Sequence, residues 1–301
     1  MMRNLTKPLL LLVAIVVFFS IFARMLSGSE TLSDYEKKHP PTPKDGETEI
    51  ASDAADSSLS ENTITEESND EYTTETVPEF NLEGIEQTME EYKIYLAEDV
   101  YTYKKGFLCS SLSDSIKERI NGISYGEDCT VPYEDLRYLQ ILYFNFEHQE
   151  ALGEIICNKA IASDLLDIFY ELYLNEYELE RVELVDEYDG DDLKSMEANN
   201  TSCFNYRVVE GTTTLSKHAL GLAIDINPFY NPYIVFNKNG SGEDYISPAG
   251  SEIYVDRSKS FPYKIDENDI CYKLFIAHGF TWGGNWNSTK DYQHFQKKIA
   301  E

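Results

Sequence analysis

Two of the five histidines in the chain have acidic neighbours at a spacing that suits metal binding. The first, His218, lies shortly before Asp225 in the segment SKHALGLAIDIN. Alternating aliphatic residues around Asp225 predict a strand that turns this carboxylate away from its apolar neighbours, where it needs a cation or hydrogen bonds. Gly221 permits a tight turn that brings His218 beside Asp225. The pair suits a zinc ion, and the alternative is a buried His–Asp hydrogen bond that only stiffens the fold.

A second motif, Asp291-Tyr-Gln-His294, follows a segment rich in glycine and tryptophan. A third ligand at His294 would leave one position of a tetrahedral ion open for water, as in catalytic zinc sites. Asp291 is close enough in sequence to act as the general base, although a surface pair is the commoner meaning of this spacing. The paired glycines 283–284 permit close backbone approach. Trp282 and Trp286 are candidates for the walls of a substrate cleft, with core packing as the alternative.

Taken together, the two motifs resemble the M15 family of zinc peptidases. The residues that carry the resemblance are Ser-x-His-x-x-Gly-x-Ala-x-Asp at 216–225, Trp-Gly-Gly at 282–284 and Asp-x-x-His at 291–294. Similarity runs from about Phe107 to the C-terminus. The family comprises D-alanyl-D-alanine carboxypeptidases and L-alanyl-D-glutamate endopeptidases, and an aspartate before the last histidine resembles the endopeptidase branch. The resemblance implies a Hedgehog/DD-peptidase-like fold, with a small antiparallel sheet and flanking helices.

The resemblance also implies roles for individual side chains. It implies three zinc ligands, namely His218, Asp225 and His294. Asp291 would be the general base. Arg207 lies where family members carry an arginine, and it would bind a substrate carboxylate or stabilise the oxyanion, with a structural ion pair to a surface acid as the alternative. Ser216 and Trp286 are further candidates for substrate binding, and Ser216 would otherwise orient His218.

The pattern of apolar residues predicts one globular domain of the α+β class over residues 86–301. Periodicity predicts helices over 116–123, 136–146 and 164–177, and strands over 182–185 and 222–226. Helices therefore predominate in the first half of this domain and short strands in the second. The stretch 227–265 departs from the family pattern and resembles an insert with long loops.

Charge and N-terminal composition indicate where the protein acts. The chain has 54 acidic and 25 basic residues, a net charge of −29, which disfavours nucleic-acid binding. Arg3 and Lys7 precede an uncharged run over 8–23, so residues 1–26 are predicted to be an uncleaved membrane anchor. A cleaved signal peptide is the alternative, and both export the chain. The acidic residues 27–85 predict a disordered tether.

We therefore expect a zinc peptidase outside the cytoplasmic membrane that cleaves peptidoglycan peptides. The bond that it cuts stays open, since a carboxypeptidase needs a closed cationic pocket and an endopeptidase needs a cleft open at both ends. The alternative from another class is a non-catalytic zinc-containing module that binds wall peptides or a partner. The five cysteines include no C-x-x-C pair typical of structural zinc, and Cys109 and Cys129 are candidates for a disulfide.

Overall fold

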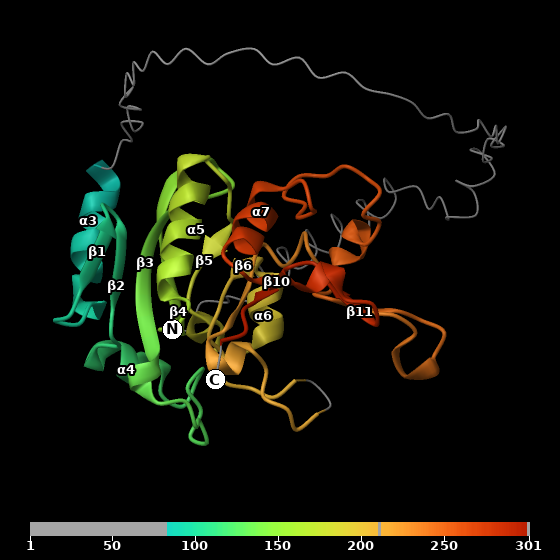
Figure 1. Ribbon diagram of the computed structural model, residues 1–301, viewed down its shortest axis with the longest axis horizontal. Coiled ribbons are helices and arrows are strands. Elements are labelled where there is room, and N and C mark those ends of the chain that lie inside the picture. Colours follow the sequence, from blue (N-terminus) through green and yellow to red (C-terminus); the bar gives the residue numbers. More distant parts are fainter. Residues whose placement is uncertain (1–82, 210–211, 300–301) are drawn as a thin grey trace, which may run out of the picture. The chain divides into compact units, whose positions relative to one another are not determined.

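The computed structural model describes residues 83–209 and 212–299, whose elements are labelled in Figure 1. The predicted anchor, residues 1–26, and almost all of the predicted tether, residues 27–85, lie outside this part. Within the described ranges, no helix is long and apolar enough to cross a membrane. The described chain has a mixed fold of short helices and small, mostly antiparallel sheets.

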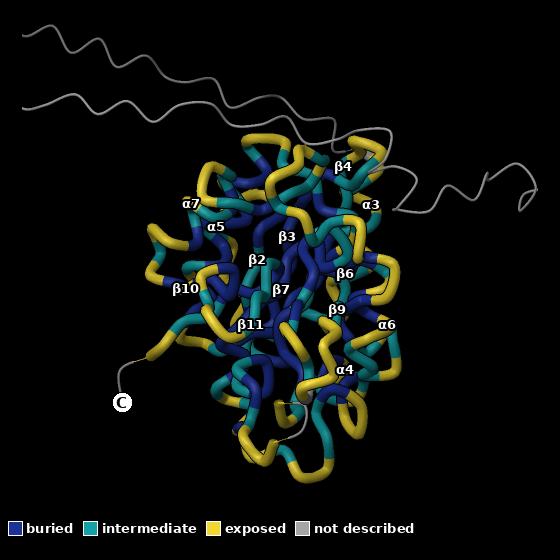
Figure 2. Tube along the Cα trace, turned by 90° about the vertical axis from the view of Figure 1, so that its right-hand side faces the viewer, coloured by how far each residue is buried: buried dark blue, intermediate teal, exposed yellow. Residues whose placement is uncertain are grey.

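The largest sheet has four antiparallel strands in sequence order, β1 (Tyr101–Lys104), β2 (Phe107–Ser110), β3 (Leu136–Phe144) and β4 (Glu150–Asn158). Leu139 and Ile141 of β3 belong to the main core with helix α5 (Ala162–Leu174), which lies along this strand in Figure 1. Leu136 and Tyr138 belong to a second apolar cluster with helix α4 (Asp114–Ile120). The sheet is therefore covered on both faces, and Figure 2 shows the buried chain around β3 and β7 at its centre.

The helix predicted over 136–146 is wrong, because this segment forms the central strand β3. The strand is buried on both faces and so is apolar at nearly every position, a pattern that periodicity alone cannot distinguish from a buried helix. His148 lies just after this strand, in the turn between β3 and β4, with φ 55°. Long strands therefore occur in the first half of the domain, contrary to the predicted order.

The other predicted helices and strands agree more closely with the structure. The helices over 116–123 and 164–177 are confirmed as α4 and α5, and the strand over 222–226 as β7 (Ala223–Asp225). The strand over 182–185 is reduced to β5 (Arg181–Val182). The remaining helices are α3 (Glu83–Glu91), α6 (Asp192–Glu197) and α7 (Ile270–Ala277). All five cysteines are free, so the pairing of Cys109 with Cys129 is absent.

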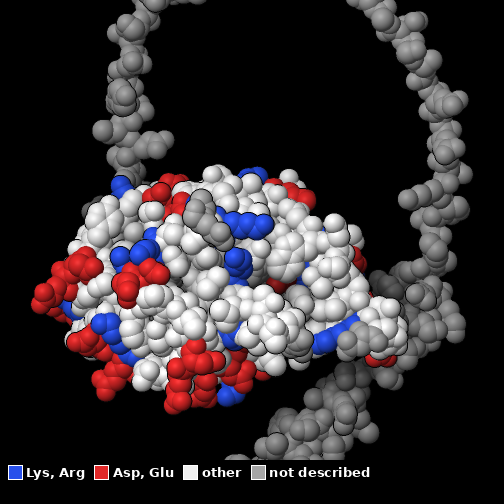
Figure 3. Space-filling view, turned by 60° about the horizontal axis from the view of Figure 1, so that its bottom comes forward, with Lys and Arg blue, Asp and Glu red and all other residues white. Residues whose placement is uncertain are grey.

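Three smaller sheets occupy the second half of the domain. One has the order β10 (Thr281–Trp282), β12 (His294–Gln296) and β7, and it is antiparallel. Another has the order β11 (Thr289–Asp291), β8 (Tyr233–Val235) and β9 (Tyr245–Ser247). The third pairs β5 with β6 (Asn200–Thr201) in parallel. On the face shown in Figure 3, acidic side chains form several patches and basic ones lie dispersed between them.

Gly221 joins the large sheet to the small ones. Its φ is +64°, and a Cβ atom there would lie 2.6 Å from the backbone nitrogen of Asn158 at the end of β4. The same nitrogen donates a hydrogen bond of 2.8 Å to the Gly221 carbonyl. Only glycine satisfies both the left-handed conformation and the close approach, so this residue fixes the turn between His218 and β7.

Replacing Gly221 with alanine should destabilise the domain more than the same change at Gly122. Both glycines have positive φ, but a Cβ atom at Gly122 would meet no atom within 4 Å. Gly122→Ala should therefore cost only about 1 kcal/mol for its conformation. Gly221→Ala should cost at least about 2 kcal/mol more because the backbone of β4 must move. Urea unfolding of both variants measures this difference, and equal costs would show that the contact with β4 is unimportant.

Candidate metal centre

The pairing of β7 with β12 brings two of the predicted ligands together. In this antiparallel pair His294 lies directly opposite Asp225. Asp225 is also fixed on its other side, since its backbone exchanges hydrogen bonds of 2.9 and 3.2 Å with Ser202. His218 lies on the short 3-10 helix His218–Leu220, and Gly221 then turns the chain into β7. Residues far apart in sequence thus converge at the edge of one small sheet.

One nitrogen of each imidazole lies within hydrogen-bond distance of the other, and each also lies close to one oxygen of Asp225. His218 Nε2 lies 3.1 Å from His294 Nδ1 and 3.3 Å from Asp225 Oδ2. His294 Nδ1 lies 3.0 Å from Asp225 Oδ1. All three side chains are buried, and they form a group able to hold a metal ion.

Hydrogen bonds on the far side of each imidazole determine which nitrogen faces the centre. His218 Nδ1 lies 2.6 Å from the carbonyl oxygen of Cys203, which can only accept, so Nδ1 carries the proton and Nε2 presents a lone pair. His294 Nε2 lies 3.2 Å from Gln296 Oε1, which leaves its Nδ1 as the lone pair. Such outer hydrogen bonds are typical of histidines that bind metals.

This arrangement fits a tetrahedral zinc ion. Zinc binds imidazole nitrogen and carboxylate oxygen at about 2.0–2.2 Å, which places neighbouring ligand atoms about 3.3 Å apart. The two imidazole nitrogens lie 3.1 Å apart, close to such an edge, and each lies 3.0 or 3.3 Å from one of the two oxygens of Asp225. Two lone pairs and a carboxylate facing one another repel unless a positive charge lies between them.

The pKa shifts of His218 and Asp225 also show that the centre favours a positive charge. Desolvation lowers the pKa of His218, but the adjacent Asp225 carboxylate outweighs it, and the net effect is a raised pKa. Desolvation alone would raise the pKa of Asp225, but His218 and His294 hold it well below the usual range. The centre therefore stabilises a charged carboxylate and attracts a proton or a cation.

Asp291 lies at the end of β11 and completes the set of predicted residues. The side chain is half-buried, but its Oδ1 is fully buried and has no hydrogen-bond partner in the described structure. Burial raises its pKa to about 7, with His294 lowering it and Asp225 raising it to smaller extents. A Cβ atom at Gly283 would lie 2.6 Å from the Asp291 carbonyl oxygen, so glycine is required where the Trp-Gly-Gly turn packs against this residue.

The insert supports the strand that carries Asp291. Tyr233 of β8 lies opposite Asp291 in the β8–β11 pair. Arg257, also in the insert, donates hydrogen bonds to Asn231 Oδ1 and Ile265 O at 3.0 and 2.8 Å. Its guanidinium lies 4.3 Å from the ring centre of Tyr292, the neighbour of Asp291. The stretch 227–265 is thus built into the candidate centre.

The three other candidates, Ser216, Trp286 and Arg207, make different kinds of contact. Ser216 Oγ accepts a hydrogen bond of 3.2 Å from the His218 backbone, so this residue orients a ligand. The ring of Trp286 lies 5.4 Å from that of His294, whereas Trp282 is buried in the core. Arg207 Nη2 lies 2.7 Å from Asp192 Oδ2. The alternative of an ion pair with an acid is therefore present in the structure.

Sequence reasoning missed three groups at this centre. Gln296 has a detectable signal, because it follows His294 by two positions on one strand and shares its face. The Cys203 carbonyl has none, since a backbone acceptor leaves no mark on residue type. Asp192 lies in a run of acids and nothing in its local sequence separates it from its neighbours.

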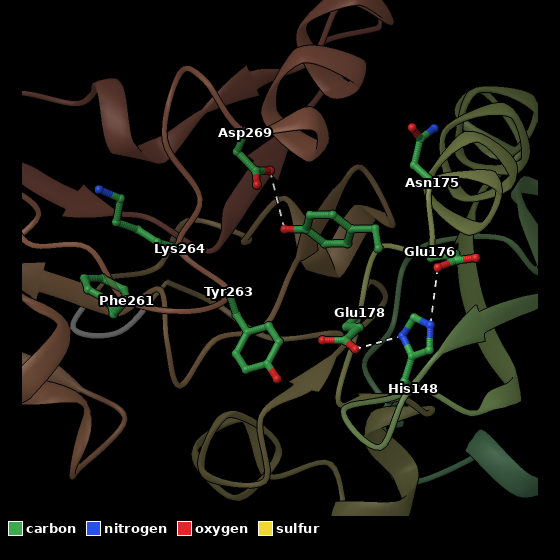
Figure 4. Close-up of a pocket in the computed structure, with 9 residues that line it drawn as sticks. His148, Asn175, Glu176, Glu178, Phe261, Tyr263, Lys264 and Asp269 are labelled. Atoms are coloured by element: carbon green, nitrogen blue, oxygen red, sulfur yellow. Dashed lines mark hydrogen bonds and ion pairs between the residues drawn. The ribbon is translucent and has the colours of Figure 1, made fainter.

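A cavity of about 440 Å³ lies elsewhere in the domain, and Figure 4 shows its lining. His148 lies between Glu176 and Glu178 there, at 3.3 and 3.0 Å from their carboxylate oxygens. No candidate ligand lines this cavity, and neither does Asp291. We therefore place the chemistry at the buried centre.

The comparisons with known proteins agree with this centre. Residues 210–297 match the model of an M15 peptidase family described as D-alanyl-D-alanine carboxypeptidase. No curated protein and no solved structure matches the chain. The matched segment is shorter than the similarity expected from about Phe107, but it contains the three candidate ligands and Asp291, with Arg207 just before its start. The match over residues 210–297 thus supports a peptidase of the M15 family.

Proposed function

We propose that this protein is a zinc-dependent peptidase that cleaves the stem peptides of peptidoglycan. The observation that carries this proposal is the convergence of two imidazole lone pairs and a carboxylate, with Asp291 within electrostatic reach and its buried Oδ1 without a hydrogen-bond partner among the described residues. The family match supports peptidase chemistry. The exported location, with an anchor in residues 1–26, rests on the sequence and belongs to the proposal.

The chain's own residues divide the work of hydrolysis. His218, Asp225 and His294 would hold a Zn²⁺ ion, which supplies Lewis-acid chemistry when bound. Asp291 would accept a proton from the attacking water at its carboxylate and pass it to the leaving amine. Arg207 would donate hydrogen bonds to the carbonyl oxygen of the scissile bond and so stabilise the negative charge that develops there.

The competing proposal is a metal-containing module that binds wall peptides without cleaving them. Such a module needs the ligands but has no use for a carboxyl group with an unsatisfied, buried oxygen beside them. Asp291 therefore favours the enzyme, and its substitution separates the two functions.

Metal binding should depend on the three ligands. The purified protein should hold one zinc ion per chain, and His294→Ala should lose it because two remaining ligands bind weakly. His148→Ala is the matched control, since this histidine is exposed and pairs only with surface carboxylates. Elemental analysis after dialysis measures the content. Retention of zinc by His294→Ala would place the ion elsewhere.

Gln296→Met should weaken zinc binding about tenfold, because it removes the acceptor that orients His294. Gln149→Met, in the exposed turn between β3 and β4, is the control. Competition with a chelating dye gives both affinities. Equal affinities would mean that the Gln296 contact does not hold the ring.

Asp291→Asn should reduce turnover by about 10²-fold or more. The zinc content should stay unchanged, because only the proton acceptor is removed. Mass spectrometry of muropeptide digests, with and without chelator, measures turnover. Loss of zinc from this variant would make Asp291 structural. A wild-type protein without any chelator-sensitive product would favour the binding module.

A further inference from the structure

The guanidinium of Arg207 is already paired with a carboxylate. Its Nη2 lies 2.7 Å from Asp192 Oδ2, and both side chains are only about one-third exposed, at 32% and 27%. Its Nε is buried and has no hydrogen-bond partner within the described residues. One side of the guanidinium is thus occupied by an acid, while a buried N–H donor stays unused.

The backbone holds this ion pair in a fixed position relative to the ligands. Asp192 is the first residue of α6, which Asp191 caps by accepting hydrogen bonds from the next turn. Asn205 connects the two regions, because its backbone nitrogen donates to His218 O at 3.2 Å and its side chain donates to Gly190 O at 3.3 Å. Arg207 follows two residues later, and its carbonyl accepts a hydrogen bond from Ser216 N.

The pair also lies within electrostatic reach of the candidate base. Burial is the main cause of the raised pKa of Asp291, and among the smaller contributions Asp192 raises this pKa and Arg207 lowers it. With one divalent cation held by the ligands, the ionised carboxylates of Asp192, Asp225 and Asp291 would together balance the charges of Arg207 and that cation. A substrate carboxylate beside Arg207 would therefore add an unbalanced negative charge at a partly buried position.

The chemistry of the ion pair matches a different group. Arg207 offers a donor and Asp192 an acceptor side by side, which is the pattern that complements a carboxamide, with its oxygen acceptor and its NH₂ donor. A carboxylate presents acceptors only and would face Asp192 as a like charge. The arrangement of donor and acceptor and the net charge both favour a carboxamide over a carboxylate.

We propose that Asp192 determines specificity by selecting peptides in which the residue after the scissile bond carries a carboxamide instead of a free carboxylate. This inference rests on the proposed peptidase function and narrows its substrate class. A D-glutamyl residue linked through its side chain has a free α-carboxyl group, which is neutral when amidated, whereas a terminal D-alanine ends in a carboxylate. The preferred bond is therefore the internal one that precedes an amidated D-glutamyl residue.

Another arginine in the same chain shows that one guanidinium can bind two carboxylates at once. Arg119 binds Glu154 through two hydrogen bonds and also contacts Glu187 at 2.8 Å, so one guanidinium here serves two carboxylates. If Arg207 were shared in this way, a free carboxylate would be accepted or preferred. The experiment must therefore compare two peptides that differ only in this group.

The test uses the full-length, zinc-loaded protein and two stem peptides that carry either D-glutamate or its α-carboxamide after L-alanine. We expect kcat/KM to favour the carboxamide at least about tenfold in the wild type. Asp192→Asn should shift this ratio toward the carboxylate by at least about tenfold. The substitution removes both the ion-pair partner of Arg207 and the negative charge that repels a substrate carboxylate. Asp189→Asn is the matched control, since this exposed acid pairs with Lys194 and not with Arg207. A wild-type preference for the carboxylate, or a ratio unchanged by Asp192→Asn, would overturn the inference.

A binding measurement separates this inference from the peptidase proposal. Calorimetric titration of zinc-loaded Asp291→Asn with the same peptides should show tighter binding of the carboxamide, and Asp192→Asn in that background should remove the preference. Selective binding without any wild-type turnover would refute the peptidase but support the role of Asp192. Equal affinity for the two peptides, or binding of neither, would overturn the inference.

Discussion

The structure depends on one constraint, which is that three electron-pair donors face one another in a buried part of the domain. The imidazoles of His218 and His294 and the carboxylate of Asp225 are all buried, with ligand atoms 3.0–3.3 Å apart. Their mutual repulsion is relieved only by a positive charge at the point where they meet. The turn at Gly221 and the pairing of β7 with β12 serve this convergence, because a shift in either would separate the donors. The centre is thus a preformed site that the fold holds open for a cation.

Two side chains near this site, those of Asp291 and Arg207, have polar atoms that are available for chemistry beyond metal binding. Asp291 and Arg207 each have a buried polar atom without a hydrogen-bond partner among the residues that the structure describes, and both lie within electrostatic reach of the ligands. The insert contributes to this placement through β8, which pairs with the strand that carries Asp291. The stretch 227–265, which departs from the family pattern, therefore supports the strand that carries the candidate base.

Residue types and spacing predicted the centre better than they predicted the fold. Imidazole and carboxylate side chains have few roles in an apolar context, which made His218, Asp225 and His294 candidates, and the family resemblance implied that they act as one set of ligands. The strand β3 could not, because burial on both faces removes the alternation that distinguishes a strand from a helix. Contacts that depend on tertiary structure, such as the Cys203 carbonyl with His218 and the pair of Asp192 with Arg207, leave no local pattern.

The central claim is that a cation lies among two imidazole nitrogens and one carboxylate oxygen. X-ray absorption at the zinc K-edge of the zinc-loaded protein tests this claim directly, since it reports the type, number and distance of the ligand atoms. We predict four light-atom ligands at about 2.0–2.1 Å, with the multiple-scattering signature of two imidazoles. A sulfur shell at about 2.3 Å, or a zinc ion without imidazole ligands, would contradict the account.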